Sequence, residues 1–156
     1  QAVCDVHPEV HALIVGEVDT RKQHYRQALE QQLAAAGLQG RVTFIAHRQD
    51  IRDIMAISTI VYSLSLQPEA FGRVSLEALS LGVPVIGYAH GGVAEQLAAL
   101  LPAGAVEVGN VAQVIRQTLV WLQQPPVVAP NRKFELAQML NATLQVYEDV
   151  LRLPRA

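Results

Sequence analysis

Short, almost continuous apolar runs alternate with longer segments of helical periodicity along most of this chain. Five runs have the length and composition of strands that are buried on both faces: His11–Gly16, Val42–Ala46, Ile60–Leu64, Pro84–Gly87 and Ala105–Val108. The segments between and after them predict helices over Arg21–Ala36, Ile51–Ile57, Val74–Leu81, Val93–Leu100 and Val111–Gln123. This alternation predicts an α/β fold with a doubly wound, mostly parallel sheet.

The two ends of the chain depart from that simple pattern. Gln1–Val6 has the pattern of a helix end with no strand before it. A doubly wound domain begins with a strand, so we expect that the first strand of the fold is missing. After Pro125-Pro126, a last helix is predicted from Phe134 to Leu151, and residues 131–151 are expected to close a single domain of residues 1–156. One face of this helix is apolar, and we expect it to pack into the core rather than to bind a partner: Phe134, Ala137, Leu140, Leu144, Tyr147 and Leu151.

Composition excludes several classes of protein. Apolar residues make up 51% and charged residues 17% of the chain, which is typical of a globular domain. A net charge of -2 offers no reason to expect a nucleic acid partner. The single cysteine, Cys4, cannot form an internal disulfide, and no apolar segment approaches the roughly 18 residues of a membrane span. We therefore expect a cytoplasmic protein, with contact to the inner membrane surface left to parts outside this sequence.

The chemistry is concentrated between Ser63 and Glu95. Pro68 keeps the residues before Glu69 in a loop, and Gly72 permits a tight turn just before a helix begins near Arg73–Val74. This helix begins at the carboxyl end of a strand, where open α/β sheets bind their ligands. Its first amides have no partner within the helix, and together with the helix dipole they attract an anion such as a pyrophosphate.

Two carboxylates flank this anion site, Glu69 in the loop and Glu77 about one turn into the helix. Carboxylates repel phosphate but accept hydrogen bonds from sugar hydroxyls, so a ligand with phosphates in the middle and a sugar at each end fits both features. A nucleotide-sugar has that layout. His90-Gly91-Gly92 follows the next strand, and its glycines either let the loop approach the ligand or merely turn the chain.

With these motifs the sequence resembles the carboxy-terminal half of the retaining glycosyltransferases of family four, which have the GT-B fold. The similarity covers about Val10 to Leu151, and most of the motif positions lie in the central segment. The matching residues are Pro68-Glu69-Ala70-Phe71-Gly72, Glu77-Ala78, Gly82-Val83-Pro84-Val85-Ile86, Gly91-Gly92 with Glu95, and in support Val42-Thr43-Phe44, Asp50-Ile51 and Tyr147.

The resemblance implies a Rossmann-like donor-binding domain and a role for each residue of the site. Glu77 is implied to hold the ribose hydroxyls, and Glu69 to act as the catalytic carboxylate that contacts a hydroxyl of the donor sugar. Arg48 is implied to lie where the base binds. The remaining positions are implied to line the sugar and the pyrophosphate: Ala70, Phe71, Gly72 and Val74 on one side, and His90, Gly91 and Gly92 on the other. The donor would be a UDP-, GDP- or ADP-sugar and the acceptor a glycan or glycolipid, as in polysaccharide or lipopolysaccharide assembly, with no metal and no separate cofactor.

The sequence departs from the family pattern in its first part. An arginine and a lysine that grip the pyrophosphate usually stand in a first strand–loop unit, which has no counterpart here. A helix terminus contributes about 1–2 kcal/mol, whereas micromolar binding needs about 8 kcal/mol. Arg73, Lys22 or Arg48 offers partial compensation. We therefore expect the chain to be a fragment that lacks its amino-terminal acceptor domain, binds donor weakly and is inactive alone.

Other classes of function find less support. His7, His11, His24 and His47 lack the spacing of a zinc site, and the sequence has neither a Gly-x-Ser-x-Gly elbow nor a phosphate loop. A sugar-nucleotide epimerase or a phosphorylase would reuse the same architecture with other chemistry. A binding or scaffolding module would keep the fold without catalysis.

Overall fold

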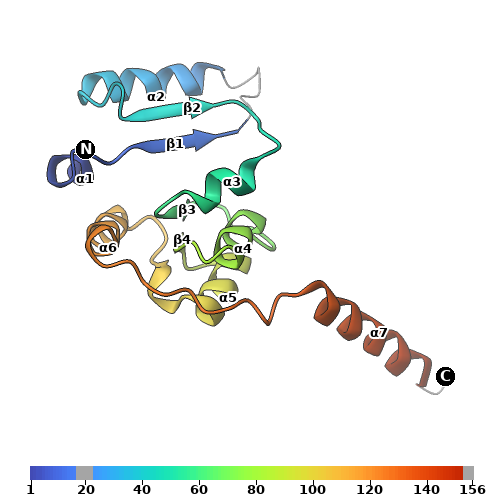
Figure 1. The fold of residues 1–156 in the computed structure, drawn as a ribbon. Coiled ribbons are helices and arrows are strands. Elements are labelled where there is room, and N and C mark those ends of the chain that lie inside the picture. The colour runs from blue at the N-terminus through green and yellow to red at the C-terminus, as the bar shows by residue number, and fades with distance from the viewer. Residues whose placement is uncertain (17–22, 153–156) are drawn as a thin grey trace.

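The computed structural model describes residues 1–16 and 23–152 and has the predicted α/β class (Figure 1). Its strands are β1 (Ala12–Val15), β2 (Val42–Ile45), β3 (Val61–Ser63), β4 (Val85–Tyr88) and β5 (Ala105–Val106). Its helices are α1 (Ala2–Val6), α2 (Gln23–Ala35), α3 (Ile51–Ala56), α4 (Arg73–Ser80), α5 (Gly91–Leu100), α6 (Val111–Gln123) and α7 (Leu136–Arg152), with a 3-10 turn, η2, at Pro102–Gly104. Every predicted strand and helix is confirmed, although the start predicted for α2 lies outside the described residues.

The strands form two parallel sheets instead of the single sheet that the alternation predicts. One sheet pairs β1 with β2, and the other has the order β3-β4-β5. Within the described part of the chain, no strand pairs with the second edge of β1 or of β3. The doubly wound order 3-2-1-4-5-6 contains the orders of both sheets, with one further strand between them. The two sheets therefore correspond to the two sides of one doubly wound sheet.

The core lies around β4, whose four residues are all buried. Helices α4 and α6 cover β4 from opposite sides (Figure 1). Leu79 of α4, Leu97 of α5 and Trp121 of α6 are among the buried side chains that meet there. By contrast, the described residues of β1, β2 and α2 include none that is buried.

Much apolar surface is consequently exposed. The accessible surface is 10789 Å², whereas a compact protein of 17.0 kDa exposes about 7,700 Å². Leu13 and Ile14 of β1 are 42% and 47% exposed. The strands of the smaller sheet thus have the apolar character of buried strands without the burial.

Helix α7 corrects one prediction. The structure describes all of α7 and buries none of its residues, so the apolar stripe does not pack into the core. Leu140 is 49% exposed and Leu144 57% exposed. The physical reason is that an extended segment carries α7 away from the body of the chain (Figure 1). Of the residues in the predicted stripe, only Phe134, just before the helix, packs against the core.

Helix α2 ends as predicted. Gly37 has φ +67°, and the N–H of Leu38 donates to the carbonyl of Leu33 at 2.9 Å. This six-to-one hydrogen bond is the Schellman arrangement, for which a glycine in the left-handed region is the usual residue.

Candidate functional site

The Glu69 loop connects β3 to α4 and turns into the helix at Gly72. Gly72 has φ +77°, and a side chain here would place a Cβ atom 2.8 Å from Val93 Cγ2 and 2.9 Å from Ser75 Oγ. Both the backbone conformation and the lack of space therefore require glycine. No side chain caps α4 or α5 at its start, and the first amides of each helix have no partner within that helix. The predicted helix start at the carboxyl end of β3 is thus confirmed.

The His90–Gly92 segment and the Glu69 loop form one structure. The His90 Nε2–H donates to the Ser65 carbonyl (2.9 Å), and the Gly92 N–H donates to the Glu69 carbonyl (2.9 Å). A Cβ atom at Gly91 would lie 2.4 Å from the Glu69 oxygen, and one at Gly92 would lie 2.4 Å from the Phe71 oxygen. The backbone of the neighbouring loop therefore fills the space over both glycines.

Gln96 of α5 is a residue of the site that sequence reasoning missed. It is 1% exposed, its Nε2 donates to the Phe71 carbonyl, and its Oε1 accepts from the Ser75 hydroxyl at 2.6 Å. Ser75 is fully buried and also lies 2.8 Å from the Gly72 carbonyl. A signal for Gln96 existed in the sequence, because it stands on the face of α5 that is otherwise apolar.

The carbonyl contacts fix which way two amides of the loop point. The carbonyl of residue i and the N–H of residue i+1 point in opposite directions in a planar trans peptide, and the described chain contains no cis peptide. The carbonyls of Glu69 and Phe71 are directed at α5. The N–H groups of Ala70 and Gly72 therefore point away from α5.

Glu77 lies in the second turn of α4, as predicted, with its side chain 37% exposed. Its one ion pair among the described residues is with Arg73, at 3.4 Å, and the Arg73 side chain is 84% exposed. Exposed pairs with this spacing contribute about 0.3–0.5 kcal/mol. Such a weak contact leaves the Glu77 carboxylate available to a stronger partner. Glu69 is partly buried in the loop before the helix.

Arg48 follows β2, as predicted, but its guanidinium is already engaged. Its Nε and Nη2 donate to the two carboxylate oxygens of Asp50 at 2.7 and 2.6 Å. This hydrogen bond from Arg48 lowers the pKa of Asp50. Asp50 precedes α3 without capping it by its side chain. The contact of Arg48 with a base stays a prediction.

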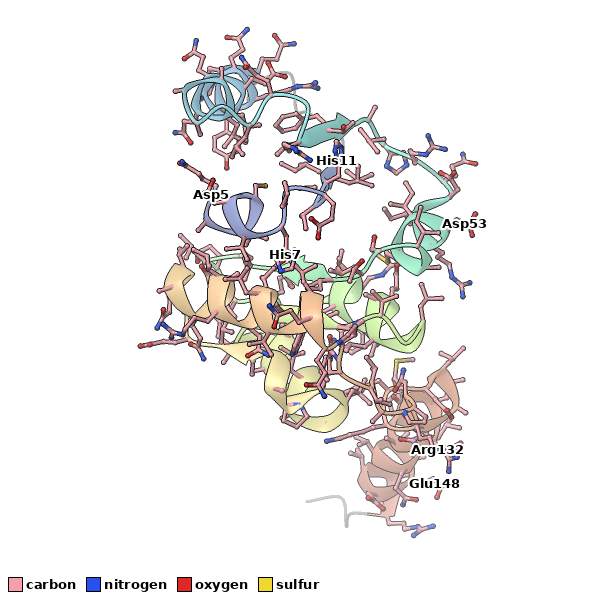
Figure 2. The ribbon with its side chains drawn as sticks, turned by 60° about the vertical axis from the view of Figure 1, so that its left-hand side comes forward. Asp5, His7, His11, Asp53, Arg132 and Glu148 are labelled. Carbon is pink, nitrogen blue, oxygen red and sulfur yellow. The ribbon has the colours of Figure 1, made fainter. Side chains whose placement is uncertain are left out.

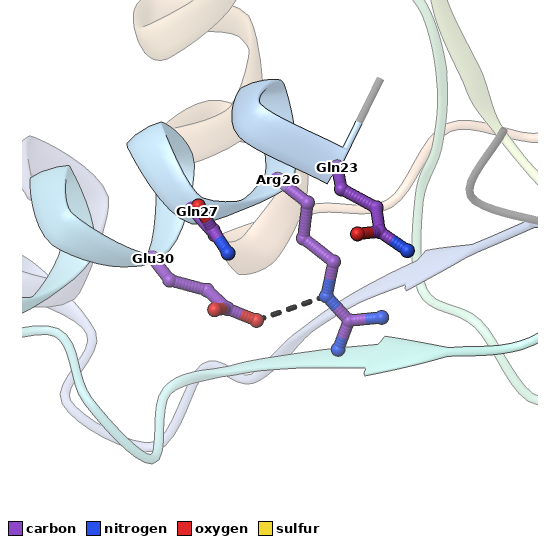
Figure 3. A pocket seen from close by; sticks show the side chains of 4 residues that line it. All are labelled: Gln23, Arg26, Gln27 and Glu30. Carbon is purple, nitrogen blue, oxygen red and sulfur yellow. Dashed lines mark hydrogen bonds and ion pairs between the residues drawn. The ribbon is translucent and has the colours of Figure 1, made fainter. Parts of the chain in front are cut away.

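Other candidate groups do not converge on these loops. Lys22, predicted as a compensating cation, lies outside the described residues. His7 and His11, both labelled in Figure 2, bond Glu9 and Thr43 respectively. No cluster of three or more metal-ligating side chains occurs among residues 1–16 and 23–152. A surface hollow on α2 is lined by Gln23, Arg26, Gln27 and Glu30 of that helix alone (Figure 3).

No helix within the part of the chain that the structure describes has the length and apolar character needed to cross a bilayer.

Comparison with known proteins identifies the family. The model of the glycosyl transferases group 1 matches residues 1–136. The chain belongs to this family.

Individual relatives agree with this assignment. The N-acetyl-alpha-D-glucosaminyl L-malate synthase of Bacillus anthracis is 27% identical over 124 aligned positions, which cover 74% of this chain and 32% of that protein. The lipopolysaccharide core biosynthesis mannosyltransferase LpsB of Rhizobium meliloti (strain 1021) is 24% identical over 97% of this chain and 46% of its own length. The crystal structure of Anabaena HepE in complex with UDP and glucose is similar to 97% of this chain and 44% of that one, with a TM-score of 0.76 and 26% identity. The chain thus spans less than half the length of these relatives.

Proposed function

We propose that this chain is the donor-binding domain of a retaining glycosyltransferase that moves a sugar from a nucleotide-sugar to a glycan or glycolipid. One observation carries the proposal: the carbonyls of Glu69 and Phe71 are tied to α5, so two loop amides face away from it beside the uncapped start of α4. Such a group of amides attracts a pyrophosphate. The structure of HepE with UDP and glucose supports this ligand class.

Each residue has a role in this proposal. The amides of Ala70, Phe71, Gly72 and Val74 line the pyrophosphate and sugar, and the carboxylates accept hydrogen bonds from hydroxyls, Glu77 from the ribose and Glu69 from the donor sugar. His90, Gly91 and Gly92 form the opposite wall, although the Gly92 N–H already has a partner. Arg48 would contact the base in this scheme. The reaction needs no metal ion or separate cofactor in this scheme.

We further propose that the complete protein contains an amino-terminal acceptor domain and a strand between β1 and β3. Two observations support this: among residues 1–16 and 23–152 no strand pairs with the second edge of β1 or of β3, and the chain covers less than half of each relative. The proposal places the protein in the cytoplasm, with any membrane contact made by other parts. It also predicts that residues 1–156 alone bind donor more weakly than micromolar and do not transfer sugar, which calorimetric titration of this chain tests.

Replacement of Glu77 tests the donor site in the full-length protein. A thermal-shift screen with UDP-, GDP- and ADP-sugars first names the donor, because a ligand stabilises the state that binds it. Glu77→Ala should then weaken donor binding by about tenfold to a hundredfold, the worth of a hydrogen bond to a charged group, and transfer should collapse.

Glu148→Ala is the matched control, because Glu148 pairs with Arg152 at the same spacing and the same 3.4 Å distance on α7. It should leave binding and transfer unchanged. Equal donor binding and transfer in the Glu77→Ala variant and the wild type would refute the donor role of Glu77, whereas absence of transfer in the full-length wild type would indicate a scaffold. The anomeric configuration of the product, measured by NMR, tests retention.

A further inference from the structure

We propose that Gln96 is a positioning residue that holds the Phe71–Gly72 peptide so that the Gly72 N–H faces the pyrophosphate. This inference rests on the proposed function. A buried amide on α5 thereby controls the direction of a hydrogen-bond donor in the Glu69 loop.

A buried glutamine at this place needs a physical reason. Gln96 is 1% exposed, whereas its neighbours on the same face of α5 include Val93, Leu97 and Leu100, which are all buried apolar residues. Burial of an amide costs free energy unless its donor and acceptor find partners. Both do here, because Nε2 donates to the Phe71 carbonyl and Oε1 accepts from Ser75. A leucine would fill this position without needing any partner.

The Phe71–Gly72 peptide is the part of the loop that most needs such a partner. Rotation of this peptide plane changes ψ of Phe71 and φ of Gly72, and glycine accepts values of φ that other residues avoid. The loop backbone alone therefore imposes little preference on its direction. A rotated peptide would present the Phe71 carbonyl to a phosphate and replace an attractive dipole with a repulsive one.

Three contacts together select the observed direction. Gln96 supplies a donor to the Phe71 carbonyl, Gly92 leaves room for it, and Ser75 holds the Gln96 amide from its other side. The Ser75 hydroxyl also lies 2.8 Å from the Gly72 carbonyl, so its single proton is shared between that carbonyl and Gln96 Oε1. The peptides on both sides of Gly72 thus contact side chains that are buried, Gln96 and Ser75.

The test compares diphosphate and nucleoside binding in the full-length protein. UDP, GDP and ADP are titrated into the wild type by calorimetry, and the one that binds is used with its nucleoside. Gln96→Leu and Gln96→Met both remove the donor to Phe71. They should weaken diphosphate binding by about tenfold to a hundredfold and leave nucleoside binding unchanged, because only the phosphates meet the Gly72 amide. Ser75→Ala, a milder change, should give an intermediate loss.

Thr118→Val is the matched control. Thr118 is 4% exposed, and its hydroxyl bonds the Val114 carbonyl within α6 and the Tyr62 hydroxyl on β3, neither of which belongs to the network of Gln96, Ser75 and Phe71. This variant should lower the melting temperature without changing diphosphate affinity.

Wild-type diphosphate affinity in a folded Gln96 or Ser75 variant, or an equal loss for nucleoside and diphosphate, overturns the positioning role alone. Failure of the wild type to bind any of the three diphosphates overturns the proposed function, and this inference with it.

Discussion

Gly92→Ala should disturb the packing of the Glu69 loop against the His90–Gly92 segment, and thereby the activity, more than it lowers the stability of the fold. The new Cβ atom would lie 2.4 Å from the Phe71 oxygen and 2.6 Å from its carbonyl carbon and Cα. Ordinary van der Waals contact begins about 1 Å farther out, and all three atoms belong to the backbone, so no side-chain rotation relieves the overlap. The Glu69–Gly72 loop must therefore move.

The size of the effect follows from that displacement. Overpacking of this kind costs about 1–3 kcal/mol of unfolding free energy. A shift of about 1 Å in a binding loop reduces catalysis by about a hundredfold. We therefore expect kcat/KM of the full-length protein to fall about a hundredfold, with weaker binding of the nucleoside diphosphate, while urea unfolding shows only the modest loss of stability.

Gly104→Ala supplies the control for stability. Its Cβ atom would lie 2.1 Å from the Val85 oxygen, at the amino end of β4 and thus at the opposite end of that strand from His90. It should cost a similar unfolding free energy and leave donor affinity unchanged. Equal donor affinity in the two variants, at equal loss of stability, would refute the conclusion that Gly92 makes room for the Phe71 carbonyl in the donor site.

Three further predictions concern the framework. Trp121→Ala should lower the unfolding free energy by about 3–5 kcal/mol in urea titrations, because this 3% exposed side chain packs in the core around β4. Burial raises the pKa of Tyr62. Its hydroxyl bonds the buried Thr118, although the residue as a whole is 43% exposed. The unfolded chain then loses this proton first, so stability should fall as the pH rises above about 10, and Tyr62→Phe should remove that part of the decline. The lowered pKa of Asp50 acts in the opposite direction: its contribution is present above about pH 4 and is lost as the pH falls through the folded-state pKa. Denaturant titrations of Asp50→Asn below pH 4 should therefore converge with those of the wild type.

The strands and helices could be predicted because each is written in a local pattern of apolar residues. The predicted strand Val42–Ala46, for example, differs from the observed Val42–Ile45 by one residue. What covers an apolar face is not local information. The stripe on α7 has the periodicity of a packed helix, yet its side chains are exposed because the chain leads the helix away from the core. For the same reason, the apolar character of β1 predicted a buried strand, whereas Leu13 and Ile14 remain exposed.

The positions of the loops in the candidate site could be predicted from the sequence, whereas the contacts between these loops could not. Motif spacing placed Glu69, Gly72 and Glu77 in a loop, at a helix start and one turn later, as the structure has them. The bond between Gln96 and the Phe71 carbonyl joins residues that lie 25 positions apart, and it depends on how α5 packs against the loop.

The paired glycines show most clearly where inference from sequence ends. A glycine indicates that a side chain has no room, but it does not say whether a ligand or another backbone takes the space. At Gly91 and Gly92 the neighbour is the backbone of Glu69 and Phe71, and the Gly92 N–H is used to hold the Glu69 carbonyl. That amide therefore cannot also serve as a free donor to a phosphate. Its bond to the Glu69 carbonyl instead turns the next N–H, that of Ala70, away from α5, so in the proposed donor site the glycine pair would act on the anion through the opposite loop.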